Sequence, residues 1–299
     1  MTPEPCSVPP RVGIMQGRLL PPWNGRFQAF PPDGWRLEFP RARAAGLDCI
    51  EWIYEVPNEE MNPLGSDAGQ AEMKTLIDET GVAVRSVCAD YYMTACLVDG
   101  DGLPVEAHLR HLDRLIGRAG AFGIRYIVLP FVDSSSARAL PSRDGLVAAL
   151  RRALPAARAA GVELHLETDL PPAAAAAVLA TINDPLVRAN YDIGNSAALG
   201  FAPAEELAIL APWLGSVHVK DRLRGGGTVP LGTGDADFVT CFRMIRRAGF
   251  DRWFILQAAR APLAPLMADG APWDEVALAR HNRTFVEAAA AAAAQEVLP

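Results

Sequence analysis

The chain has 299 residues, of which 50% are hydrophobic, and a net charge of -7, so it is long enough for one large barrel or two average domains. The acidic balance argues against a nucleic-acid partner, because binding a phosphodiester backbone requires a concentrated basic face. No apolar run approaches membrane-spanning length, and residues 1–6 lack the basic and apolar regions of a signal peptide. Five cysteines without a Cys-x-x-Cys pair fit reduced thiols. We therefore expect a cytoplasmic protein with no membrane or nucleic-acid partner.

Eight short apolar segments have the composition of β-strands, and each is followed by helical sequence. No Ser/Gly-rich or charge-rich tract separates two halves of the chain. We therefore expect one domain spanning residues 1–299, with a barrel core at about 11–260 and a C-terminal helix at about 273–295. The expected strands are Arg11–Met15, Asp48–Ile53, Ala83–Cys88, Tyr126–Phe131, Glu163–Glu167, Arg188–Asp192, Ser216–Val219 and Trp253–Gln257.

The segments between these strands have helical periodicity, as in Val105–Phe122 and Arg143–Ala160. A glycine stands shortly before five of the strands, as expected where a helix ends in a glycine cap. Eight strand-helix units close most economically into a (β/α)8 TIM barrel, with its chemistry on loops at the carboxyl ends of the strands. An open doubly wound sheet is the alternative, but Gly13–Arg18 does not match Gly-x-Gly-x-x-Gly. The five glycines are Gly46, Gly81, Gly123, Gly161 and Gly249.

A polar residue able to bind a metal ends each of the last four strands: Glu167, Asp192, His218 and Gln257. Parallel strands of a barrel have their carboxyl ends on one face, so these side chains could converge. A mixed oxygen and nitrogen set without cysteine suits Mn²⁺, Mg²⁺, Co²⁺ or Zn²⁺. The sequence therefore predicts one bound divalent metal ion.

Further polar residues stand close to the same strand ends. Lys220 lies two residues beyond His218 and so shares its face of the strand, within reach of a substrate above the metal. The loop from Asp221 to Asp237 contains five glycines, whose backbone N–H groups could bind an anion or could simply form turns. An anionic substrate is one alternative, and carboxylates that balance the local cations are the other. Other expected substrate contacts are Arg18, Glu51, Asp90, Asn195, Arg222 and Arg260.

Together these segments resemble the xylose-isomerase-like TIM-barrel superfamily, within the group of sugar phosphate isomerases/epimerases. The resemblance runs from about Gly13 to Arg260. The resemblance implies that Glu167, Asp192 and His218 hold one divalent metal, with Gln257 in place of a second glutamate. Its most specific pieces are Gly13–Leu19, Ser86–Tyr91, Leu166–Leu170, Tyr191–Ser196, His218–Arg222 and Leu256–Arg260.

The glutamine affects the expected mechanism, because epimerases of this superfamily use two metal-bound glutamates on opposite faces of an enediolate. An amide oxygen can coordinate a metal, but an amide cannot exchange a proton near neutral pH. Glu167 is then the base, and isomerisation by a single base is favoured over epimerisation by two. If a second base exists, the candidates are Lys220, Asp221, Glu51 and Asp90.

The resemblance implies a metal-dependent isomerase or epimerase that acts on a sugar or sugar phosphate through an enediolate. Two alternatives remain: a keto-sugar epimerase or β-eliminating lyase on the same site, and a sugar-binding barrel without catalysis. Endonucleases of this superfamily act at abasic DNA sites with three metals, but the acidic balance and the lack of further histidine ligands argue against that activity. Barrels of this type often pair, so a homodimer is compatible with the resemblance.

Overall fold

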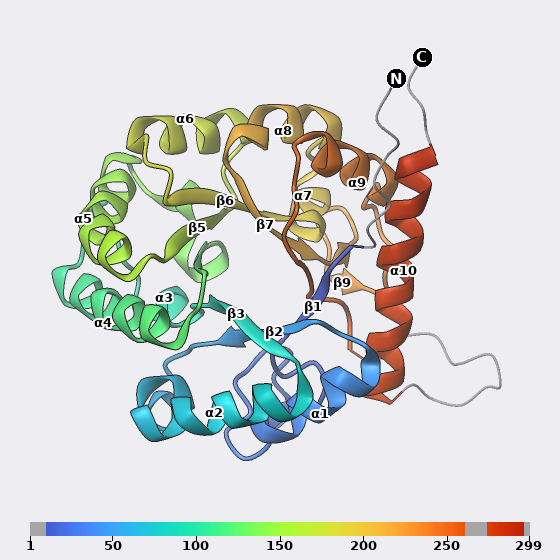
Figure 1. The fold of residues 1–299 in the computed structure, drawn as a ribbon. Helices are drawn as coiled ribbons and strands as arrows, with labels where there is room; N and C mark the ends of the chain where they lie inside the picture. The colour runs from blue at the N-terminus through green and yellow to red at the C-terminus, as the bar shows by residue number, and fades with distance from the viewer. Residues whose placement is uncertain (1–9, 261–273, 296–299) are drawn as a thin grey trace, which may run out of the picture.

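The computed structural model describes residues 10–260 and 274–295. In these residues, eight parallel strands close into a barrel in the order β1-β10-β7-β6-β5-β4-β3-β2 (Figure 1). The expected TIM barrel is therefore confirmed, and the open sheet is excluded. The barrel strands are β1 (Val12–Met15), β2 (Cys49–Ile53), β3 (Ala83–Cys88), β4 (Tyr126–Phe131), β5 (Glu163–Thr168), β6 (Val187–Asp192), β7 (Leu214–Val219) and β10 (Phe254–Leu256).

Helices surround the barrel and bury its outer face (Figure 1). The outer helices are α1 (Trp35–Ala45), α2 (Asp67–Thr80), α4 (Glu106–Phe122), α5 (Asp144–Ala160), α6 (Pro172–Ile182), α8 (Pro203–Leu210), α9 (Phe238–Arg247) and α10 (Glu275–Gln295). Two short helices, α3 (Tyr91–Thr94) and α7 (Ile193–Leu199), follow β3 and β6. Short 3-10 turns lie at Trp23–Gly25, Glu59–Met61, Pro63–Gly65, Asp133–Ser135, Ala137–Ala139 and Ala211–Trp213. Within the described ranges, no helix is long and apolar enough to cross a membrane.

Glycine caps end the helices where the sequence predicted them. Gly46, Gly81, Gly123 and Gly161 each follow the last residue of a helix with a positive φ, between 66° and 98°. Residues with a Cβ rarely adopt this conformation, so glycine lets the chain turn sharply into the next strand. Gly249 also has a positive φ of 72° and stands one residue beyond the cap of α9.

The barrel closes where β1 meets β10. Val12 pairs with Phe254 and Gly13 with Ile255, while the other edge of β1 pairs with β2. Gly13 is needed at this seam, because a Cβ there would lie 2.4 Å from Cys49 Sγ and 2.8 Å from the Cδ1 of Ile255. After β7, a small antiparallel hairpin of β8 (Asp221–Arg222) and β9 (Thr228–Val229) extends the carboxyl-terminal end of the barrel.

Gly13→Ala should therefore destabilise the fold by about 1–3 kcal/mol, the usual cost of overpacking a closely packed interior. Urea unfolding followed by circular dichroism measures this change in the free energy of unfolding. Gly117→Ala in α4 is the control, because nothing lies within 4 Å of its added Cβ. The control should be neutral or stabilising by about 0.5–1 kcal/mol, since alanine favours helix more than glycine does. Equal losses in both variants would contradict the close approach at the seam.

Candidate metal centre

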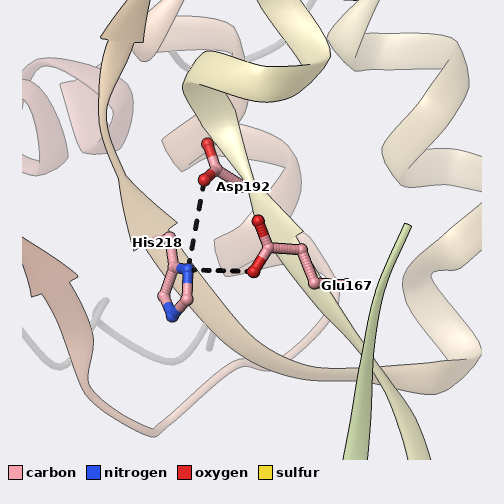
Figure 2. A group of neighbouring side chains, drawn as sticks. All are labelled: Glu167, Asp192 and His218. Carbon is pink, nitrogen blue, oxygen red and sulfur yellow. Dashed lines mark ion pairs between the residues drawn. The ribbon is translucent and has the colours of Figure 1, made fainter. Parts of the chain in front are cut away.

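Three of the four expected ligands meet at the carboxyl end of the barrel (Figure 2). Glu167 lies near the end of β5, Asp192 ends β6 and His218 lies in β7, and one ligand atom of each lies within 4.8 Å of the others. His218 Nδ1 is 3.6 Å from Glu167 Oε2 and 4.0 Å from Asp192 Oδ2. Two ligand atoms that each lie about 2.1 Å from one ion can be at most about 4.2 Å apart. Both distances from the histidine nitrogen are therefore compatible with a single divalent ion, and the two carboxylates lie within 4.8 Å of each other.

Glu51 orients the histidine for this role. Its Oε1 lies 2.6 Å from His218 Nε2, and both side chains are fully buried. An Nε2–H group that donates to Glu51 leaves Nδ1 directed at the two carboxylates, as in the carboxylate-histidine-metal arrangement. Burial opposes a charged imidazole, but the carboxylates of Glu51, Glu167 and Asp192 together outweigh it and raise the pKa of His218 to about 9. The structure therefore places Glu51 beneath the histidine, whereas the sequence had suggested a substrate contact.

Lys220 and Gln257 lie beside the carboxylates. Lys220 Nζ is 2.8 Å from Asp192 Oδ2 and donates a hydrogen bond of 2.8 Å to Gln257 Oε1. Gln257 stands one residue beyond β10, and its Nε2 donates to Gln28 Oε1 at 2.9 Å. Both the oxygen and the nitrogen of the amide thus form hydrogen bonds, and the oxygen accepts from the ammonium group that also contacts Asp192. The amide of Gln257 therefore lies beside the three residues and contacts Lys220 and Gln28; its role as a fourth ligand stays a prediction.

Asn195 holds the two carboxylate ligands in position. Its side chain donates to Glu167 Oε1 at 2.8 Å, and its backbone N–H donates to Asp192 Oδ1 at 2.8 Å, which caps the start of α7. Arg222 in turn donates to Asn195 Oδ1 at 2.9 Å. Burial raises the pKa of Glu167 to about 7, although the neighbouring His218 opposes this shift. A carboxyl group that titrates near neutral pH is suited to accept a proton from a substrate.

A polar chain continues from the histidine into the barrel interior. The Asn190 side chain lies 3.2 Å from His218 Nδ1, and Ser216 Oγ donates to Asn190 Oδ1 at 2.6 Å. His165 Nδ1 lies 2.8 Å from the same hydroxyl. Its Nε2 is 2.9 Å from Glu163 at the other end of β5. His165 is therefore a buried link below the metal ligands.

A cavity of about 530 Å³ opens above these three residues. Of the residues expected to contact a substrate, Arg18, Asp90, Asn195 and Arg222 line it, together with Glu167, Lys220 and Gln257. Arg260 does not line this cavity. It donates to the backbone oxygens of Phe27 at 2.7 Å and Leu20 at 3.0 Å, and so fixes the loop between β1 and α1.

Gln28 is a residue of the site that the sequence did not reveal. It accepts from Gln257 and donates to Asp90 Oδ2 at 2.8 Å, so it bridges the first and last thirds of the chain across the cavity. It lies in an irregular loop with no strand end or motif beside it. No local pattern could therefore have indicated it.

The family model described as xylose isomerase-like TIM barrel matches residues 39–281. L-ribulose-5-phosphate 3-epimerase UlaE of Escherichia coli (strain ATCC 8739) is 27% identical over 271 residues, which cover 85% of this chain and 93% of that protein. Such relatives are epimerases and thus isomerases, which agrees with the expected enzyme class.

Two solved structures show the same fold. One is D-allulose 3-epimerase from Methylomonas sp., with a TM-score of 0.67 and 18% identity over 94% of this chain and 98% of that one. The other is the IOLI protein with a zinc atom, with a TM-score of 0.68 and 15% identity over 93% and 97%. The match of the family model over residues 39–281 confirms the resemblance to xylose-isomerase-like barrels drawn from the sequence, and these structures confirm the fold.

Glu51→Gln should weaken the binding of Mn²⁺ or Zn²⁺ by about 10–100-fold, the usual effect of changing the partner that orients a metal-bound histidine. Calorimetric titration of metal-free protein measures this affinity. Glu206→Gln is the matched control, because Glu206 is also buried but hydrogen-bonds to Ser196. Unchanged metal affinity in Glu51→Gln would contradict a ligand role for His218.

Proposed function

We propose that this chain, which belongs to the xylose isomerase-like TIM barrel family, is a metal-dependent epimerase or isomerase of a sugar. The observation that carries the proposal is the convergence of Glu167, Asp192 and His218 below an open cavity. The zinc atom in the IOLI structure, which has the same fold, supports a divalent ion at these residues. The epimerases among the relatives support the reaction class.

Glu167 is the proposed base. A divalent ion held by these ligands would polarise a sugar carbonyl and its neighbouring hydroxyl, which makes the adjacent C–H group acidic and stabilises an enediolate. Glu167 lines the cavity, and Asn195 fixes one of its oxygens. Its carboxylate is thus available to take the proton at neutral pH and return it.

Epimerisation requires a residue that protonates the second face of the enediolate, whereas isomerisation does not. Gln257 has no proton to exchange, but the Lys220 ammonium group touches its oxygen and lines the cavity. If Lys220 supplies the second proton, the enzyme can invert a stereocentre as an epimerase. If Glu167 alone moves the proton between two carbons, the reaction is an aldose-ketose isomerisation.

Glu167→Gln should lower kcat by about 10²–10⁴-fold, the usual contribution of a general base, while an oxygen ligand to the metal remains. The assay is deuterium exchange from D₂O into a panel of ketoses, followed by NMR, with metal content measured in the same samples. Removal of metal by a chelator should abolish exchange, and re-addition should restore it. Near-normal exchange in Glu167→Gln would refute the role of Glu167 as the base. If the wild-type protein binds sugars but exchanges no deuterium, it is a sugar-binding barrel without catalysis.

The Lys220→Met variant tests whether Lys220 protonates the second face of the enediolate. If Lys220 protonates it, this variant should still exchange deuterium at the substrate carbon but should form the inverted sugar about 10²-fold or more slowly. The ratio of exchange to inversion, measured by NMR and chromatography, separates this role from a general loss of structure. An unchanged ratio would favour a single base and therefore isomerisation.

A further inference from the structure

Gln28 lies in the loop between β1 and α1, and the backbone of this loop is held on both sides of it. The backbone oxygen of Phe27 accepts hydrogen bonds from two arginine side chains. The backbone N–H group of Phe30 donates to Glu55 Oε1 at 2.8 Å. These contacts fix the backbone from which the half-buried side chain of Gln28 lines the cavity.

The amide of Gln28 has three polar partners. Its Nε2 donates to Asp90 Oδ2 at 2.8 Å, and its Oε1 accepts from Arg18 at 3.2 Å and from Gln257 Nε2 at 2.9 Å. A carboxylate only accepts hydrogen bonds, and a guanidinium group only donates them. Asp90 and Arg18 therefore fix which end of the amide carries the oxygen, and this oxygen faces Gln257.

The orientation of Gln28 determines that of Gln257 in turn. An oxygen on Gln28 requires a donor opposite it, so Gln257 presents its NH₂ group to Gln28 and its own oxygen to the other side. On that side, Lys220 Nζ donates to Gln257 Oε1 at 2.8 Å and lies 2.8 Å from Asp192 Oδ2. If the Gln257 amide were turned by half a rotation, its NH₂ group would face the ammonium group, and two donors would meet.

The lysine at the end of this chain of hydrogen bonds is one of only two in the sequence, Lys74 and Lys220. Lys74 is exposed in α2, whereas Lys220 is buried. An ammonium group is a compact charge with three donors on one atom, whereas a guanidinium group is a planar fork. The single nitrogen of Lys220 can therefore contact Asp192 and Gln257 at the same time.

We infer that Gln28 is a positioning residue that acts on Lys220 through the amide of Gln257. It holds the amide oxygen toward the lysine and thereby keeps the ammonium group against Asp192 at the wall of the cavity. The catalytic consequence rests on the proposed function, in which Lys220 is the candidate that protonates the second face of the enediolate.

The first test follows Lys220 by NMR in Zn²⁺-loaded protein made with isotope-labelled lysine, which contains one ammonium group for each of the two lysines. Hydrogen bonds slow the exchange of ammonium protons with water, and the exposed Lys74 is the internal reference. Gln28→Met keeps the length of the side chain but removes its oxygen and its N–H groups. This variant should speed the exchange of the Lys220 protons by about ten-fold or more, the effect of losing one supporting hydrogen bond.

Gln70→Met in α2 is the control variant for this measurement. The amide of Gln70 donates to the backbone oxygens of Leu64 at 2.9 Å and Arg118 at 3.1 Å, and none of these three residues lines the cavity. The control should leave the exchange of the Lys220 protons unchanged. Equal exchange rates in wild type and Gln28→Met would overturn the inference, and so would equal increases in Gln28→Met and Gln70→Met.

The second test asks whether Gln28 acts through the orientation of an amide. A carboxylate has an oxygen at either end, so Gln257→Glu presents an acceptor to Lys220 in both orientations. In the Gln257→Glu background, Gln28→Met should therefore change the exchange of the Lys220 protons by less than about two-fold, the usual scatter of a double-mutant cycle. An equal effect of Gln28→Met in both backgrounds would mean that Gln28 only supports its loop, and it would overturn the inference.

Activity gives a separate readout. Gln28→Met should lower the ratio of inversion to deuterium exchange by about ten-fold, in the same direction as Lys220→Met, because Lys220 loses part of its support. An unchanged ratio beside faster exchange of the Lys220 protons would contradict the catalytic role of Lys220 and leave its positioning by Gln28 intact. If wild type exchanges no deuterium, the proposed function fails, and the NMR comparison, repeated on protein treated with a chelator, still decides whether Gln28 positions Lys220.

Discussion

Closure of the eight-stranded barrel is the constraint on which the rest of the structure depends. The pairing of β1 with β10 joins residues 12–14 to residues 254–256 and fixes the circumference of the barrel. Only at that circumference can Glu51 on β2 reach His218 on β7, on a different side of the barrel interior and 167 residues later in the chain. The seam requires Gly13, because a side chain there would push against Cys49 and Ile255. The strands that carry these two residues, β2 and β7, flank the β1–β10 pair, so the packing at this pair sets the distance between Glu51 and His218.

The barrel interior is unusual for a packed core in that a line of polar groups crosses it. Glu51, His218, Asn190, Ser216 and His165 are all buried, and each contacts the next. Buried polar groups are costly unless they are hydrogen-bonded, so such a chain is tolerated only when its members satisfy one another. In return it restricts the orientation of the histidine ring, so that the ring nitrogen facing the carboxylates is fixed before a metal arrives. A site of this kind is preorganised by its supporting residues as much as by its ligands.

Two arginine side chains at and beside the cavity donate hydrogen bonds to the backbone of a loop. Arg18 and Arg260 both donate to the backbone oxygen of Phe27 and thereby hold the loop after β1 over the barrel. Burial lowers the pKa of Arg18 to about 9, with the charge of Arg260 as a second cause. Two adjacent guanidinium groups are thus tolerated because backbone dipoles solvate them, and they shape the cavity wall. Both arginines therefore hold a loop of the protein in place.

The sequence by itself determined the fold and predicted which three side chains cluster at the carboxyl end of the barrel. Strand composition, glycine caps and the polar residue at each of the last strand ends are local patterns, and a parallel barrel brings strand ends together whatever the loops do. Glu167, Asp192 and His218 could therefore be identified without coordinates. Lys220 could be placed beside them for the same reason, because residues two apart share one face of a strand.

Tertiary structure alone decided the roles of the surrounding residues. Glu51 and Arg260 also stand at or near strand ends, yet Glu51 faces the buried side of His218 and Arg260 binds a loop. The glycine-rich loop encloses Asp221, although its composition was equally compatible with a bound phosphate. No sequence pattern indicated that Gln28 belongs to the site, because the path of an irregular loop depends on contacts with residues far away in the sequence. Periodicity fixes where a strand ends, but the partner of each hydrogen bond depends on distances that only the closed barrel sets.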